Sequence, residues 1–137
     1  MIRSLLAGTG MAVVSWASHA ADSCALEAAR RVSQGHFSGL AAMFAEPKDS
    51  VGLARSLEQL ARPLGSIDEV LPLSRQTAGV SARRSVALAS LPASYPFEGS
   101  WALAITRGGA RYEFQASSEP GSSCKLLALH VGRLASE

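Results

Sequence analysis

Few side chains in this 137-residue chain could act as a base. His130, near the C-terminus, has no acidic residue close by in sequence to orient its imidazole, and His36 adjoins Gly35 at a weak break between two helical runs. The sequence holds no Gly-x-Ser-x-Gly motif, no phosphate-binding loop, no HExxH motif and no group of ligands at metal spacing. These patterns predict no metal, no cofactor and no catalytic residue set.

Cys24 and Cys124 are the two cysteines of the chain. In an oxidising compartment an even pair predicts a disulfide, here closing a loop of about 100 residues, for which chain entropy allows about 4–5 kcal/mol. Two separate buried thiols are the alternative. A bridge would leave no thiol to act as a nucleophile.

The N-terminus has the three parts of a secretory signal peptide: the basic Arg3, an apolar stretch from Leu5 to Ala17, and the small residues Ser18 and Ala20 at positions −3 and −1. The stretch is shorter than the roughly 20 residues of a membrane-spanning helix, which disfavours a stable membrane anchor. A lipoprotein signal fits poorly, because a charged residue lies two positions before Cys24.

We therefore expect residues 1–20 to be a signal peptide cleaved after Ala20, and residues 21–137 to form a single domain in the periplasm or outside the cell. Without Arg3, 12 basic residues stand against 11 acidic ones. A composition so close to neutral gives no sign of the clustered basic face that nucleic-acid binding needs, and we expect no nucleic-acid partner.

Three helical runs come first. One runs from Cys24 to Val32 in good helix formers, and a shorter one runs from Phe37 to Phe44. Asp49-Ser50 then caps a third, whose leucines at 53, 57, 60 and 64 form an amphipathic stripe that ends at Gly65.

After Gly65 the pattern changes to strands. The candidate strands are 67–73, 81–91, 100–107, 111–116 and 124–131, with a two-residue hairpin signal at Gly108-Gly109. The last candidate is apolar on both faces, which indicates a central place in a sheet. Helices followed by antiparallel strands predict an α+β fold, with the N-terminal helices packed on a curved antiparallel sheet of four to five strands.

Alternation predicts which side chains share a face of this sheet. We expect Trp101, Tyr112 and Phe114 to lie together on an apolar face, with Glu113 pointing to solvent. His130 and these three aromatic residues are the candidate ligand- or partner-binding residues. The predicted buried set is Leu26, Phe37, Leu40, Phe44, Leu53, Leu57, Leu60, Val86, Leu103, Ile105, Phe114, Leu127 and Leu129.

The order of these elements resembles the nuclear transport factor 2-like (cystatin-like cone) superfamily, particularly its small secreted bacterial members. The similarity rests on two helices broken at Gly35-His36-Phe37, a third helix ending in Leu64-Gly65, and a late Gly-Gly hairpin. It implies a conical fold with a pocket between sheet and helices, and a homodimer formed through the sheet. The superfamily includes both enzymes and binding domains, and so the fold does not select a function.

Two functions follow as hypotheses. The first is an exported, non-catalytic periplasmic binding domain, whose ligand is a protein partner or a small apolar molecule; an immunity or accessory role is one form of it. The second is a small enzyme of the cone fold, such as an isomerase or dehydratase, using His130 and Tyr112. An open interior in which His130 meets a carboxylate would favour the enzyme.

Overall fold

The computed structural model describes residues 23–45, 47–77, 79–80, 83–88, 96–121 and 123–135. The expected signal peptide lies outside the described residues. Along the described chain the elements are α2 (Ser23–Ser33), α3 (Phe37–Ala42), α4 (Ser50–Ala61), the 3-10 turn η1 (Arg62–Leu64), β1 (Ile67–Leu73), β2 (Arg84–Ala87), β3 (Glu98–Thr106), β4 (Arg111–Ser118) and β5 (Leu126–Arg133). Helices thus precede the strands, which confirms the predicted α+β class. None of the described helices is long and apolar enough to cross a membrane.

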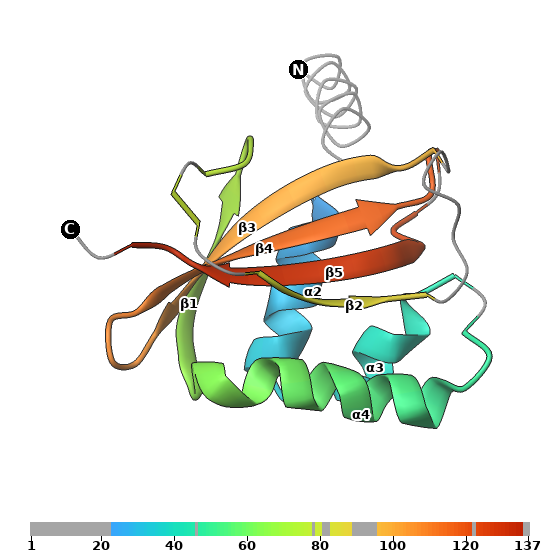
Figure 1. Cartoon of the computed structure of the whole chain (residues 1–137), viewed down its shortest axis with the longest axis horizontal. Helices are drawn as coiled ribbons and strands as arrows, with labels where there is room; N and C mark the ends of the chain where they lie inside the picture. The colour runs from blue at the N-terminus through green and yellow to red at the C-terminus, as the bar shows by residue number, and fades with distance from the viewer. Residues whose placement is uncertain are drawn as a thin grey trace, which may run out of the picture.

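The strands form a five-stranded antiparallel sheet in the order β1-β3-β4-β5-β2. β5 lies between β4 and β2, in the interior position that its apolar sequence predicts. β1 and β2 are consecutive in sequence but occupy opposite edges, so the chain between them must cross the sheet. The three labelled helices lie on one side of the curved sheet (Figure 1). We call the sheet face toward these helices the inner face and the opposite one the outer face.

Local signals explain how α4 begins and ends. The Asp49 carboxylate accepts a hydrogen bond from the backbone N–H of Gly52 at 2.9 Å, the N-cap contact that its residue type predicts. After η1, Gly65 adopts a φ of 70°, a left-handed conformation that glycine tolerates, and the chain turns into β1. At the same end of α4, Arg84 of β2 donates to the Leu60 carbonyl at 2.6 Å, and its charge complements the negative pole of the helix.

Small residues bring α2 very close to the inner face of the sheet. Ala25, Ala28 and Ala29 of α2 are fully buried in one core cluster with Ala102 and Ala104 of β3, and α2 contacts β1, β3 and β4. At its first turn the backbone N–H of Ala25 donates to Ser100 Oγ at 3.0 Å in a buried contact. This bond satisfies one of the helix donors that have no partner within the helix.

The prediction that Leu103 and Ile105 belong to the buried core is therefore wrong. Both faces of β3 are apolar: one carries alanines and the other carries large side chains. Alternation alone therefore could not show which face meets the helices. The helix takes the alanine face because only small side chains permit its close approach, and Leu103 and Ile105 lie half-buried on the outer face.

Most of the predicted core is confirmed. The buried members of the predicted set are Leu40, Phe44, Leu57, Leu60, Phe114, Leu127 and Leu129. Four others, Leu26, Phe37, Leu53 and Val86, are partly buried against the same cluster.

Glu113 is also placed differently from its prediction, because it is 1% exposed. It lies on the outer face, under the connection that crosses from β1 to β2. The backbone N–H of Thr77 donates to one carboxylate oxygen, and Arg83 Nη2 lies 3.3 Å from the other. A connection between distant strands buries this charge, which local alternation cannot reveal.

Candidate ligand-binding groove

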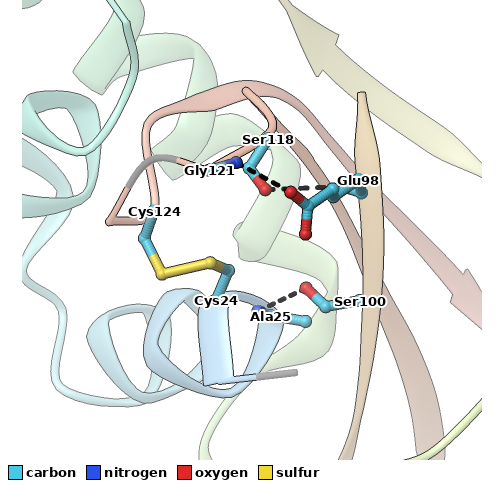
Figure 2. The surroundings of a disulfide bond; sticks show 7 residues. All are labelled: Cys24, Ala25, Glu98, Ser100, Ser118, Gly121 and Cys124. Atoms are coloured by element: carbon cyan, nitrogen blue, oxygen red, sulfur yellow. Dashed lines mark hydrogen bonds between the residues drawn. A yellow bond between two sulfur atoms is a disulfide. The ribbon is translucent and has the colours of Figure 1, made fainter. Parts of the chain in front are cut away.

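The predicted disulfide is confirmed. Cys24, at the start of α2, is bonded to Cys124, just before β5, with the two Cα atoms 5.3 Å apart and 100 positions of sequence between them (Figure 2). Cys24 is buried, whereas Cys124 is half-exposed and has a φ of 58°. A non-glycine residue in the left-handed region is held there by its surroundings, here by the bridge and the turn that carries it.

The turn between β4 and β5 is tied to the start of β3. The Glu98 carboxylate accepts from the backbone N–H of Gly121 at 2.8 Å, and the Glu98 carbonyl accepts from Ser118 Oγ at 3.4 Å (Figure 2). The Gly121 bond and the disulfide thus hold this otherwise exposed turn beside the first turn of α2, and the Ser118 bond ties the end of β4 to the same residue.

The four candidate binding residues do not gather in one place. Residues opposite each other in an antiparallel ladder share a face, and Trp101 pairs with Gln115, which pairs with His130. Tyr112 and Phe114 pair with Ala104 and Ala102 on the inner face. The structure therefore places Trp101 and His130 on the outer face and both other aromatic residues against the helices. The expectation that the three aromatic side chains share a face is wrong.

His130 has a hydroxyl neighbour. Its Nδ1 is hydrogen-bonded to Ser85 Oγ on β2. Burial, and then the nearby charge of Arg83, lower the pKa of this imidazole, which favours its neutral form. His130 and Tyr112 lie on opposite faces of the sheet, so they are not placed to act on one substrate.

The described residues form a pocket that the sequence did not indicate. It is a groove of about 680 Å³ beside the disulfide. One wall is α2, with Glu27 and Arg31. The floor includes the end of α3 and the residues that follow it, 42–45, and the other wall is the β4–β5 turn with Glu119, Cys124 and Lys125. We call it the disulfide groove.

Backbone pairing holds the groove floor. The Leu126 N–H donates to the Met43 carbonyl at 2.8 Å, and the Ala45 N–H donates to the Leu126 carbonyl at 2.9 Å, which joins the chain after α3 to the start of β5. The lining combines apolar side chains, such as Phe44, with two acidic and two basic ones. Converging charged groups in a concave site are typical of places that orient a polar ligand.

Arg31 lies at the protein surface, but its neighbours restrict the position of its side chain. Its Nε donates to Glu27 Oε2 at 3.0 Å, one helical turn earlier. Its guanidinium also lies over Gly39 of α3, where a Cβ would come within 2.6 Å of Arg31 Nη1. A side chain at Gly39 would therefore displace the end of Arg31 from this position.

The sequence contains a partial signal for this site. Glu27 and Arg31 have the i, i+4 spacing of a helical ion pair, and Gly39 interrupts a helical run in which alanine would be favoured. Nothing local shows that the β4–β5 turn meets them, because that contact depends on the disulfide and on the order of the strands.

Comparisons with known proteins leave the groove unassigned: no family model matches the chain, and neither a curated protein nor a solved structure matches it. The resemblance to the nuclear transport factor 2-like superfamily stays a prediction. Among the described residues, no three histidine, cysteine, aspartate or glutamate side chains gather to hold a metal ion.

Proposed function

We propose that the mature chain is an exported, non-catalytic periplasmic domain that binds a protein partner in the disulfide groove. The observation that carries this proposal is the groove itself, about 680 Å³ with apolar and charged lining. Its two walls come from segments 100 positions apart that a covalent bond joins. Rigid walls favour binding, because less conformational entropy is lost when the ligand arrives.

The lining supports a protein partner over a small apolar ligand. Four charged side chains of both signs border the groove. A small apolar molecule would remove water from these charges without replacing their hydrogen bonds, which opposes binding. A polypeptide offers amide donors and acceptors together with side chains of either character.

The test is capture from an envelope extract of the source bacterium by immobilised, oxidised residues 21–137, with identification by mass spectrometry. We expect a defined protein to be retained by the wild-type domain, lost with Arg31→Gln and kept with Arg30→Gln, whose exposed side chain is the neighbouring arginine on α2. We expect His130→Ala to keep it too, because this residue lies on the outer face. Capture that survives Arg31→Gln would place binding elsewhere on the domain.

Export is tested separately by the intact mass of the protein purified from its natural host. We expect a chain that begins at or near Ala21 and carries a disulfide. A lipid-sized increment on Cys24 would contradict both the soluble form and the bridge.

A further inference from the structure

We infer that the disulfide groove recognises a peptide carboxylate, with Arg31 as the residue that binds it. This inference rests on the proposed function and specifies the chemistry of the partner. Guanidinium groups bind carboxylates in a bidentate manner through their N–H edges. Arg31 uses Nε for Glu27, which leaves the Nη atoms at the groove for a second acceptor.

The Arg31 side chain is already held in position before a ligand binds. The Glu27 carboxylate holds the Nε edge at 3.0 Å, and the end of the guanidinium occupies the space that a side chain at Gly39 would fill. The Arg31 side chain is 34% exposed, so its charge is partly desolvated while remaining reachable from solvent. An arginine that is already held in position loses little side-chain conformational entropy when an anion binds.

The acidic groups at the groove select among anions. Glu27 and Glu119 line the same groove as Arg31 and Lys125. Two carboxylates repel a dianion such as phosphate more strongly than a singly charged ligand. They also accept hydrogen bonds, which suits a ligand that brings N–H donors along with one carboxylate. A peptide meets both conditions.

The remaining lining fits the rest of such a ligand. Ala42 and Met43 provide apolar surface between the charged walls, and the groove volume lies within the roughly 300–1,000 Å³ usual for ligand sites. We therefore expect a short segment with one aliphatic side chain on this surface and its carboxylate on Arg31. The carboxylate could be a chain terminus or an acidic side chain, since both present the same group.

The test uses ¹⁵N-labelled, oxidised residues 21–137 and three acetylated alanine tetrapeptides: one with a free C-terminus, one with a C-terminal amide, and one amidated with aspartate at the third position. We expect the free-acid or the aspartate peptide to shift amide signals of residues 27–45 and 119–126 with a saturable dissociation constant. The fully amidated peptide should shift them at least tenfold more weakly. Whichever acid peptide binds identifies the source of the carboxylate.

Matched variants separate the site from the fold. Arg31→Gln should weaken the carboxylate peptide at least tenfold, whereas Arg30→Gln should leave its affinity unchanged. Gly39→Ala retains every charge but displaces the flexible end of Arg31, and should weaken the peptide severalfold with an otherwise native spectrum. If Gly39 had only a structural role, Gly39→Ala would weaken peptide binding only by disturbing the fold. Weaker binding with a native spectrum therefore points to the displaced Arg31 side chain.

Several outcomes would overturn the inference. Equal binding of the amidated peptide, equal shifts with sodium acetate alone, or binding that survives Arg31→Gln would each do so. If the extract still yields an Arg31-dependent partner while no carboxylate peptide binds, the proposed function stands and the ligand chemistry is wrong. If neither the extract nor the peptides give binding, both fail together.

Discussion

Removal of the disulfide should destabilise this domain by a large fraction of its total stability. The bridge joins residues separated by 100 positions, and the chain-entropy model gives about 4.7 kcal/mol at 25 °C for a loop of roughly that length. Single domains of this size unfold with about 5–15 kcal/mol. The left-handed backbone of Cys124 can relax once the bridge is gone, which returns part of the loss. We therefore expect a decrease of about 3–4.5 kcal/mol.

The perturbation should be Cys24→Ala with Cys124→Ala. Cys24 is 1% exposed in the core, and alanine avoids placing an unpartnered hydroxyl there, as serine would. Reduced wild-type protein is the companion sample, because it breaks the same bond and retains both sulfur atoms. Agreement between the two separates the loss of the bridge from the loss of side-chain packing.

Urea unfolding, followed by the fluorescence of Trp101, measures the effect. Trp101 is the one tryptophan in residues 21–137 and is half-buried on β3. The unbridged chain should also show a larger m-value, because its unfolded state exposes more surface. A loss below about 1 kcal/mol with an unchanged m-value would refute the reasoning, since the bridge would then constrain the unfolded chain very little.

Three further expectations concern the outer face. Burial and the charge of Arg83 lower the pKa of His130 below the ordinary 6.5, so the unfolded state binds more protons there, and the free energy of unfolding should fall as the pH drops from 6.5 toward the folded pKa. His130→Gln should remove this slope in urea titrations, while the exposed His36→Gln should keep it. Arg83→Met should lower the free energy of unfolding by about 1–3 kcal/mol, because Glu113 stays buried but loses the cation beside it. Adding Glu113→Leu should recover part of this loss in stability. A loss below about 0.5 kcal/mol for Arg83→Met would contradict that account. If the domain dimerises through its sheet, Leu71→Asp at a leucine 38% exposed on β1 should raise the dimer dissociation constant at least tenfold in sedimentation, and a wild-type monomer at every concentration would rule the dimer out.

The order and type of the elements follow from local sequence. The first helix, expected from Cys24 to Val32, is α2 at Ser23–Ser33, and the strand expected at 67–73 is β1 with the same bounds. Capping by Asp49 and the stop at Gly65 delimit α4 as their residue types predict. The disulfide could be predicted because two cysteines in a chain expected to be exported have one possible partner each.

What local sequence could not decide was which face of each strand meets the helices. β3 alternates alanine with large apolar residues, and a rule that places large side chains inside selects the wrong face. The deciding factor is the helix surface, whose Ala25, Ala28 and Ala29 make a close approach possible. Burial of Glu113 has a similar origin, since it depends on a connection that crosses between opposite sheet edges.

The disulfide groove escaped prediction for the same reason, and its two walls differ in what holds them. α2 is fixed by its alanine contacts with the sheet and by the bond from Ala25 N–H to Ser100, none of which requires the bridge. The β4–β5 turn has mostly exposed residues around Gly121, and Glu98 and the bridge anchor it. Reduction should therefore leave the Arg31 wall in place and loosen the turn wall, which keeps the Glu98 contact and the hydrogen bond from Glu119 N–H to the Lys125 carbonyl. Under the proposed export, the oxidising compartment favours the proposed binding site as well as the fold, because it maintains the disulfide.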